Sequence, residues 1–445
     1  MSRDHLGGNH AVVIGASVVG LLAARVLAGH FDRVTVVERH RLPAAPPAPD
    51  SGLTPPHVHA LLARGAHALE QLFPGLFAEL EEAGAVRLDQ AADVRAYVHG
   101  DWKDRYQSGF AIHCVSRPLL EWTLRQRLAR LRNVLILDEA TVDHLLSTAD
   151  GRIIRGVQVT RDTMPETLIA ELVVDAGGRD SRVAEWLYGL GFGTVPTSSV
   201  RLDLVLASRV FRMPSPGPDW KALTIATGTP CTRSGFLLPV EGDRWVASVW
   251  GYFGDHPTGD FDQWMEFARS LPVSDLYEAV DDATPLGEIR VERFPGHLRR
   301  HYERMERFPE GLAVLGDAAC SFSPVYGQGL TMGALGALEL DACLKAQPKW
   351  QIAGLSQRFR HRLAAVLDVP WHLATSADLG QQRPDPRRPA SLSMVSKYTH
   401  RLLAAATHDR ELNDAFLQAM NMVKPPESLF APGTVRKVLT AALPG

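Results

Sequence analysis

The stretch Ala11-Val12-Val13-Ile14-Gly15-Ala16-Ser17-Val18-Val19-Gly20 decides the fold of this chain. Its first four residues are apolar and mostly β-branched or small, which predicts a strand buried on both faces, and the two glycines bracket the turn into a helix. A second apolar run, Val34–Val37, ends directly before Glu38. Together these segments predict a βαβ unit with an acidic residue at the tip of its second strand.

The glycine turn has the residues of a dinucleotide-binding site. Gly15 permits the tight turn, Gly20 permits close packing of helix on strand, and the helix N-terminus offers N–H groups and a positive dipole to a pyrophosphate. Ser17 stands where such motifs carry a middle glycine, and it is small enough to sit there and donate a hydrogen bond to a phosphate. Glu38 can accept hydrogen bonds from the ribose hydroxyls of an adenosine.

A second glycine-rich turn lies far downstream. The apolar run Gly311–Leu315 is closed by Gly316-Asp317-Ala318-Ala319. The segment Pro324-Val325-Tyr326-Gly327-Gln328-Gly329 comes next and precedes a helical pattern from Leu330 to Leu344. No further βα repeat follows, so this turn does not start a separate dinucleotide-binding fold.

The two turns, in this order and at this separation, resemble the motifs of FAD-containing monooxygenases of the hydroxybenzoate-hydroxylase fold. The resemblance implies that Asp317 binds the ribityl chain of FAD and that the loop Pro324–Gly329 lies beside the isoalloxazine ring. Gly327 and Gly329 let backbone N–H groups approach a planar ligand, and the positive end of the following helix would stabilise negative charge on the reduced flavin.

Two further segments have counterparts in the same family. The helix after Ser116 begins with Arg117, which the resemblance places near the flavin phosphate or the ring edge. The loop Pro55–Leu62 is expected to pass over the flavin, with either of its histidines, His57 and His59, as a hydrogen-bond donor. No third ligand of a suitable type lies nearby in the sequence, so we expect no metal site.

The runs Val134–Leu137 and Ala140–Val142 are expected to form a strand pair that covers the adenine. No catalytic side chain is assigned, because the flavin carries the chemistry. The residues expected to contact FAD are Gly15, Ala16, Ser17, Gly20, Glu38, Arg39, His59, Arg117, Val142, Gly316, Asp317, Pro324, Gly327, Gln328, Gly329 and Leu330.

Within the family, the chain most resembles the actinobacterial flavin-dependent epoxidases of polyether polyketide biosynthesis. This resemblance covers nearly the whole chain and includes His57-Val58-His59, Pro324–Gly329 and Ala374–Asp378. It implies that reduced FAD reacts with O₂ to a C4a-hydroperoxide, which transfers one oxygen atom to a lipophilic secondary metabolite. No catalytic His/Asp pair is evident, which favours epoxidation of a polyene or polyketide over hydroxylation of a phenol.

Other functions stay open at this point. Aromatic hydroxylation is the nearest alternative, and oxygen-independent FAD reductases or dehydrogenases of the geranylgeranyl-reductase type share these motifs. A flavin-folded binding protein without enzymatic activity is a third alternative. Halogenation is disfavoured because the chain lacks a WxWxIP signature.

One stretch departs from the family pattern. Single-component hydroxylases carry the motif GADGxxSxVR, whereas in Val173–Arg182 of this chain Gly177 replaces the aspartate and Asp175 is displaced. We therefore expect weaker binding of NADPH, although a plain structural turn is equally compatible with these residues. NAD(P)H is expected to donate electrons either directly or through a partner flavin reductase.

The middle of the chain predicts an antiparallel sheet that would roof the flavin. Leu204–Phe211, Gly235–Pro239 and Trp245–Gly251 have strand patterns, and Val240–Arg244 has the composition of a hairpin connection. Aromatic residues at strand spacing form either a core or one wall of a substrate pocket. The residues expected to line such a pocket are Trp220, Phe236, Trp250 and Tyr252.

We therefore expect an α/β fold, α+β overall: a Rossmann-like FAD-binding domain with an inserted antiparallel-sheet substrate domain and a helical C-terminal region. The C-terminal helices are expected to pack on the FAD-binding domain or to form a lid over the substrate. The expected boundaries are 1–85, 112–195 and 286–345 for the FAD-binding domain, 86–111 and 196–285 for the substrate domain, and 346–445 for the helical region.

Composition narrows the class of partner. The 445 residues include 47 basic and 50 acidic residues, a net charge of −3, which argues against a nucleic-acid partner and fits a lipophilic small molecule and O₂. The 4 cysteines share no CxxC spacing, so we expect reduced thiols and a cytoplasmic location. No apolar run reaches the roughly 18 residues of a spanning helix, so no integral membrane segment is expected.

Overall fold

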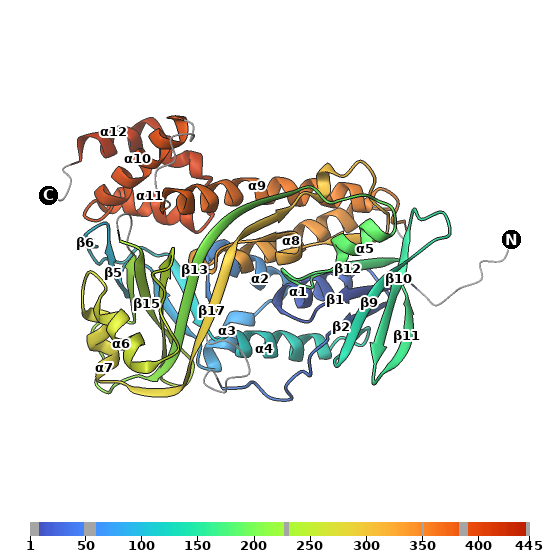
Figure 1. The fold of residues 1–445 in the computed structure, drawn as a ribbon, viewed down its shortest axis with the longest axis horizontal. Coiled ribbons are helices and arrows are strands. Elements are labelled where there is room, and N and C mark those ends of the chain that lie inside the picture. The colour runs from blue at the N-terminus through green and yellow to red at the C-terminus, as the bar shows by residue number, and fades with distance from the viewer. Residues whose placement is uncertain (1–8, 49–58, 227–230, 349–350, 382–389, 442–445) are drawn as a thin grey trace.

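The computed structural model describes residues 9–48, 59–226, 231–348, 351–381 and 390–441. A parallel sheet of five strands forms the core at one end of the molecule (Figure 1). The side chains of Ala11, Val12 and Val13 have no exposed surface, as expected for a strand covered on both faces. In sheet order the strands are β18 (Leu312–Val314), β12 (Leu172–Asp175), β1 (His10–Ile14), β2 (Arg33–Val37) and β8 (Val134–Leu137).

Helices and a β-meander cover this sheet. Helix α1 (Val18–Leu27) lies against β1 and β2, and it also packs on α4 (Arg117–Ala129). Helix α8 (Gln328–Lys345) packs on α1, on α2 (Ala63–Leu72) and on α9 (Leu355–Gln381). The βαβ unit and the helices after both glycine turns are thereby confirmed. The meander against β12 and β2 consists of β9 (Ala140–Ser147), β10 (Ile154–Arg161) and β11 (Met164–Ile169).

The expected strand pair of Val134–Leu137 and Ala140–Val142 is wrong. Strand β8 pairs with β2 at the edge of the parallel sheet, whereas β9 pairs with β10 in the meander. Glu139 lies between the two strands with a φ of 53°. This left-handed turn directs the chain out of the parallel sheet, so the two runs cannot pair with each other.

A second large sheet of eight strands lies at the other end of the molecule (Figure 1). All of its neighbouring strands are antiparallel except β14 and β5, so the predicted antiparallel sheet is confirmed. Helices α6 (Phe261–Arg269) and α7 (Asp275–Asp281) cover one face. The strand order is β19 (Cys320–Ser321), β17 (Thr284–Arg300), β13 (Thr197–Arg212), β16 (Arg244–Tyr252), β15 (Arg233–Val240), β14 (Ala222–Ala226), β5 (Val94–Val98) and β6 (Asp101–Trp102).

The long strands β13 and β17 join the two ends of the molecule. They pair from Thr197 opposite Arg300 to Arg212 opposite Thr284, and Figure 1 shows them crossing from the α5 end to the α6 end. The expected domain boundary between residues 285 and 286 therefore falls inside β17. Strand β19 pairs with the last part of β17, so the second glycine turn is attached directly to the large sheet.

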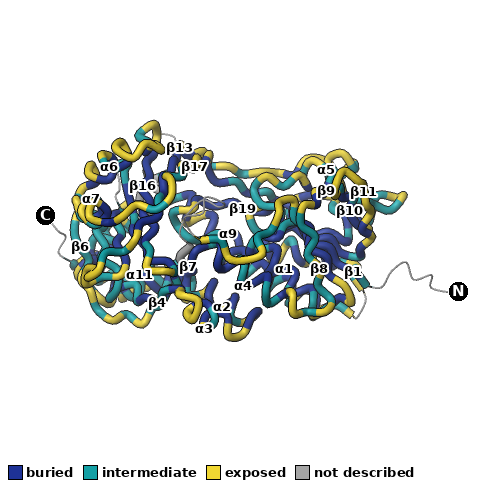
Figure 2. Tube along the Cα trace, turned by 90° about the horizontal axis from the view of Figure 1, so that it is seen from below, coloured by how far each residue is buried: buried dark blue, intermediate teal, exposed yellow. Residues whose placement is uncertain are grey.

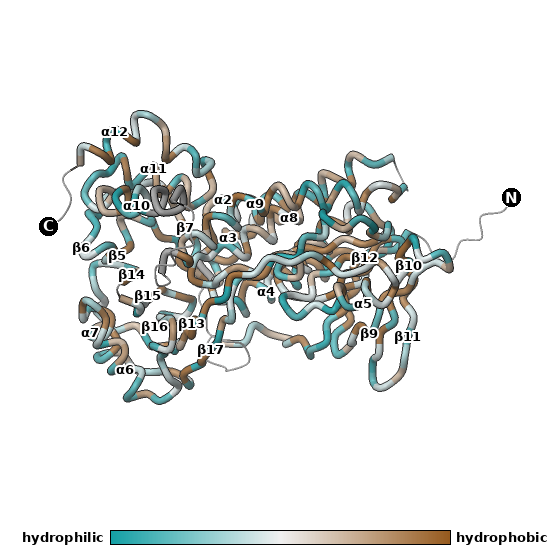
Figure 3. Tube along the Cα trace, turned by 45° about the horizontal axis from the view of Figure 1, so that its top comes forward, coloured by the Kyte–Doolittle hydropathy of each residue, from teal (hydrophilic) through white to brown (hydrophobic). Residues whose placement is uncertain are grey.

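Smaller elements complete the fold. A three-stranded sheet connects the two ends, and a C-terminal bundle lies beside β5 and β6 (Figure 1). Figures 2 and 3 show buried stretches around β1 and β16, and hydrophobic stretches inside both ends of the molecule. The remaining elements are β3 (His59–Leu61), β7 (Ala111–Val115), β4 (Val86–Asp89), α3 (Leu76–Glu82), α5 (Val183–Gly189), α10 (Ala390–Ala405), α11 (Arg410–Met420), α12 (Pro432–Thr440) and the 3₁₀ turns η1 (Tyr302–Arg304), η2 (Gly316–Ala318), η3 (Pro324–Tyr326) and η4 (Pro426–Phe430).

Candidate active site

The turn between β1 and α1 requires both of its glycines. Gly15 has a φ of 96°, and a Cβ atom there would lie 2.7 Å from the carbonyl oxygen of Ala176. A Cβ atom on Gly20 would lie 1.9 Å from the carbonyl oxygen of Gly15. The backbone is therefore packed too closely for side chains at these positions. Helix α1 begins directly after this turn with its first N–H groups free of intrahelical partners, as at any helix start.

Glu38 reaches back from the end of β2 to the same turn. Its carboxylate accepts hydrogen bonds from the N–H groups of Ala16 and His40, both at 2.9 Å. Each oxygen keeps a second lone pair for a further donor. Arg39 is exposed and donates from Nε to the His40 ring at 3.1 Å, so its guanidinium is not held in the turn.

Helix α4 brings a cation to the start of α1. Ser116 caps α4 by accepting a hydrogen bond from the N–H of Leu119 at 3.3 Å, so the helix begins at Arg117. Arg117 donates to Ser17 Oγ at 2.7 Å and to Glu121 at 2.9 Å, and Ser17 donates to Glu121 at 3.0 Å. The residue in place of the middle glycine therefore holds the guanidinium beside the turn.

The second turn lies opposite this cation. Asp317 as a residue is exposed, but many protein atoms surround its carboxylate. Their desolvation of the carboxylate raises the pKa of Asp317, and the positive charges of Arg117 and Arg179 oppose this shift. Gly316 approaches Val19 of α1, where an added Cβ atom would meet the Val19 side chain at 2.9 Å. The two turns therefore face one another.

The loop Pro324–Gly329, which we name the ring loop, leads into α8. Gly327 has a φ of 63° and caps this helix without a side-chain hydrogen bond. Three buried polar atoms in or beside the ring loop have no hydrogen-bond partner among the described residues: Ser323 Oγ, Gln328 Oε1 and Thr331 Oγ1. Buried polar atoms are rarely left unsatisfied, so this loop is suited to meeting another polar group. Leu330 and Gly329 lie in the first turn of α8.

Two arginines near these turns were not predicted. Arg125, two helical turns after Arg117, is buried, and its Nη2 has no hydrogen-bond partner in the described part of the chain. Its position on the same face of α4 was the available signal. Arg179 donates to Ser321 Oγ at 3.0 Å and lies over the Phe294 ring at 5.1 Å. Nothing in the sequence placed it, because these contacts join residues distant along the chain.

Asp175, in the stretch that departs from the family motif, has an internal role. Its carboxylate is buried and accepts hydrogen bonds from the Gly177 N–H at 2.9 Å and from Ser181 Oγ at 2.5 Å. Burial raises the pKa of Asp175 to about 6, although the hydrogen bonds from Ser181 and Gly177 oppose the shift. This side chain therefore organises the turn after β12.

The large sheet separates the four predicted pocket aromatics. Phe236, Trp250 and Tyr252 lie on the face away from α6 and α7, and Val325 of the ring loop packs against this cluster. Trp220 instead stacks on Trp245 at a centroid distance of 5.6 Å, within the core under α6 and α7. Alternation along β16 puts Trp245 on the opposite side from Trp250 and Tyr252, and Trp220, which precedes β14, packs on the Trp245 side. We name the first side the inner face; its other apolar residues are Leu202, Leu204, Leu206 and Phe294.

A polar cluster is buried at the edge of the inner face. Asp378 near the end of α9 has no exposed side-chain surface and lies 2.6 Å from His297 Nε2. The hydroxyl of Tyr326 donates to Asp378 at 2.7 Å, and that of Tyr252 lies at 3.4 Å. His297 is far from Asp378 in sequence, so only the tertiary fold reveals this His/Asp pair; the sequence interpretation missed it.

His297 has a defined protonation pattern. Its Nδ1 accepts a hydrogen bond from the Ser323 N–H at 3.2 Å, so Nε2 carries the proton and donates it to Asp378. The carboxylate therefore accepts from His297 and from Tyr326. Burial and the charge of Asp378 raise the pKa of Tyr252 and of Tyr326 above the ordinary tyrosine value, so both hydroxyls stay protonated.

Three predicted positions lie away from these groups or outside the described side chains. Val142 is buried in the meander, opposite Val159. The backbone of His59 is part of β3 and pairs with Val115 of β7, and His57 lies outside the described residues. Within the described ranges, no group of three or more His, Cys, Asp or Glu side chains is arranged to hold a metal ion.

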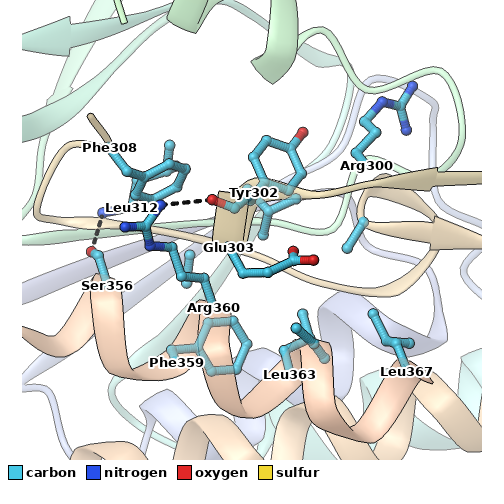
Figure 4. Close-up of a pocket in the computed structure, with 14 residues that line it drawn as sticks. Arg300, Tyr302, Glu303, Phe308, Leu312, Ser356, Phe359, Arg360, Leu363 and Leu367 are labelled. Carbon is cyan, nitrogen blue, oxygen red and sulfur yellow. Dashed lines mark hydrogen bonds between the residues drawn. The ribbon is translucent and has the colours of Figure 1, made fainter. Parts of the chain in front are cut away.

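A small pocket between α9 and β18 is part of the packing of α9 (Figure 4). Arg360 points across it and donates to the backbone oxygens of Tyr302 at 2.7 Å and Met305 at 3.0 Å. The Ser356 hydroxyl accepts from the Leu312 N–H at 3.2 Å. Its lining does not include the ring loop or the inner face, so we do not assign it to the active site.

Comparisons with known proteins agree with this geometry. Residues 9–349 match a family model described as an FAD binding domain. Protein Rv3254 of Mycobacterium tuberculosis is 33% identical over 439 residues, which cover 93% of this chain and 90% of that protein. Kynurenine 3-monooxygenase of Salinispora arenicola is 27% identical over 76% of this chain and 72% of its own length.

Solved structures share the fold. The structure of p-nitrophenol 4-monooxygenase PnpA from Pseudomonas putida DLL-E4 superposes with a TM-score of 0.66 and 18% identity, covering 93% of this chain and 97% of that one. In the described parts of the chain, no helix is both long and apolar enough to cross a membrane.

Proposed function

The chain belongs to the FAD binding domain family and is an FAD-dependent monooxygenase, and from this premise we propose that it hydroxylates a lipophilic aromatic substrate that carries a hydroxyl group. The observation that carries the proposal is the buried Asp378 carboxylate, which meets the hydroxyl of Tyr252 at the inner face. An apolar wall with a single polar site suits an apolar ring with a single hydroxyl.

The residues of the two turns fit FAD. The start of α1 and Arg117 would hold the pyrophosphate, Glu38 would accept from the adenosine ribose, and Asp317 would meet the ribityl chain. The unsatisfied Gln328 Oε1 of the ring loop would find a partner on the isoalloxazine ring. When bound, FAD supplies the oxygen-transfer chemistry, with NAD(P)H as the electron donor.

The chain itself binds, orients and excludes water. The N-terminal dipole of α8 points at the ring loop and would stabilise negative charge there. The contact between Tyr252 and Asp378 is the longest of the three, so the Tyr252 hydroxyl is the least committed donor. A substrate hydroxyl would donate to the Tyr252 oxygen while Tyr252 donates to Asp378, which would draw proton density from the substrate.

Epoxidation is the second candidate function. The sequence favoured it because no His/Asp pair was evident, and the contact of His297 with Asp378 removes that ground. The apolar side chains of the inner face still suit a polyene, which needs no acid–base partner. Epoxidation, which the resemblance to polyether epoxidases implies, therefore stays the second proposal. We prefer hydroxylation because of the contact between Tyr252 and Asp378.

Product analysis separates the two candidates. The FAD-loaded protein is supplied with NADPH and ¹⁸O₂, with and without a generic flavin reductase, and is offered lipophilic phenols beside polyenes that lack a hydroxyl. We expect one ¹⁸O atom in a hydroxylated phenol and no turnover without O₂. Epoxide formation from the polyenes alone would favour the second candidate, and turnover without oxygen would identify a reductase instead. Rapid NADPH oxidation without the added reductase would argue against a partner protein.

A further inference from the structure

Asp378 comes from a part of the chain outside the family domain. The family model ends at residue 349, and Asp378 lies near the end of α9, which starts at Leu355. Helix α9 packs along α8 and reaches the large sheet (Figure 1). A C-terminal helix thus delivers a carboxylate to the edge of the inner face.

The burial of this carboxylate needs an explanation. Removing a carboxylate from water costs several kcal/mol unless hydrogen bonds or charges compensate for it. Asp378 has no exposed surface and is compensated by His297 at 2.6 Å and Tyr326 at 2.7 Å. Neither donor is a cation: tyrosine is neutral, and Nδ1 of His297 accepts a hydrogen bond from the Ser323 N–H and so carries no proton. The charge is therefore held by directed hydrogen bonds, which fix the positions of their donors.

Both donors lead to the ring loop. Tyr326 belongs to this loop, and Ser323, directly before it, donates its N–H to His297. Inside the loop, the Tyr326 N–H lies 3.5 Å from the Ser323 oxygen, and the Gly327 N–H donates to the Pro324 oxygen at 3.2 Å. The ring loop is therefore tied to the large sheet and to α9 through His297 and Asp378, beside the packing of Val325 on the inner face.

We propose that Asp378 is a positioning residue that holds the ring loop in place through Tyr326 and His297, so that α9 completes the active site from outside the FAD-binding region. This inference rests on FAD binding but is independent of the choice of substrate. Asp378 would set how the loop meets the isoalloxazine ring, whereas the two glycine turns set whether FAD binds at all.

The test compares Asp378→Asn and Tyr326→Phe with Asp368→Asn in the FAD-loaded full-length protein. Asp368 is the matched control, because it lies on the same helix and pairs with Arg299 at 2.7 Å without touching the ring loop. We expect Asp378→Asn and Tyr326→Phe to retain FAD but to shift its visible absorption bands, and to slow product formation relative to NADPH consumption by roughly tenfold. The double variant is expected to differ little from Asp378→Asn, because the Tyr326 contact is one of the two contacts that Asp378→Asn already disturbs.

The absorption spectrum decides the outcome without any substrate. If Asp378→Asn lowers only the melting temperature, as Asp368→Asn would, and both ring-loop variants keep the wild-type spectrum, the positioning role is refuted. Should Asp378→Asn fail to fold, Tyr326→Phe alone carries the same test. A wild-type protein that binds no FAD would refute the proposed function itself, which keeps the two failures apart.

Discussion

At the scale of single residues, the glycine turns are the most sensitive part of the chain. Substitution of Gly20 by Ala places a Cβ atom 1.9 Å from the Gly15 oxygen, so the turn must shift. We expect Gly20→Ala to lose most bound FAD and at least about 2 kcal/mol of stability. Flavin content after gel filtration and urea unfolding measure both effects.

Gly433→Ala is the matched control for that substitution. Gly433 lies in α12, and no heavy atom outside its neighbourhood lies within 4 Å of an added Cβ. Alanine is expected to leave FAD binding unchanged and to raise stability slightly, by up to about 1 kcal/mol. Equal flavin loss in both variants would contradict the role given to the turn.

Asp175 gives a pH-dependent prediction. Its pKa is about 6 in the folded chain and 3.8 as the ordinary value, so the folded state binds more protons between these values. Stability from this group is present below about pH 4 and is lost as the pH rises through 6. We expect the stability difference between wild type and Asp175→Asn to change by up to about 3 kcal/mol between pH 4 and 7. Urea midpoints across that range test it, and a pH-independent difference would contradict the raised pKa.

At the scale of elements, we expect one face of the large sheet to contact the substrate and the other to form a structural core. Trp250 lies on the inner face beside the ring loop, whereas Trp220 stacks on Trp245 on the covered face. We expect Trp250→Ala to lower kcat/KM at least roughly tenfold. Trp220→Ala is expected to cost about 1–3 kcal/mol of stability while it leaves kinetics nearly unchanged. Parallel kinetic and thermal-unfolding measurements test the pair; similar kinetic losses in both variants would contradict the assignment.

The sequence predicted those elements whose signals are local. The turn around Gly15, the helix that begins at Arg117 and the hairpin after Val240 each depend on neighbours within a few residues, and each is found as predicted. The face of Trp220 and the pair of His297 with Asp378 depend on contacts across distant segments. Hydrophobic periodicity does not show which distant segments come into contact, so the sequence could not predict the polar cluster.

At the scale of the whole molecule, β13 and β17 make the two ends interdependent. A fragment of residues 196–285, the expected inserted part of the substrate domain, retains β13 but loses nearly all of β17, its partner along the full length. We expect this fragment to lack cooperative unfolding by circular dichroism, because an unpaired long edge strand remains. A fragment that unfolds cooperatively would show that the insertion is autonomous. As a control, the full-length chain should give a single sharp transition.

The place of β18 at the edge of the parallel sheet has a consequence for synthesis. Strand β1 leaves the ribosome early, but β18, two places away in the same sheet, follows only after about 300 further residues. At roughly 5–20 residues per second, this delay is on the order of 15–60 s. Strand β12 is made about midway through that interval, and over the last roughly 140 residues it is the open edge of the sheet. We therefore expect a nascent chain of this topology to present an unpaired strand edge, where other chains can pair, until β18 has been made.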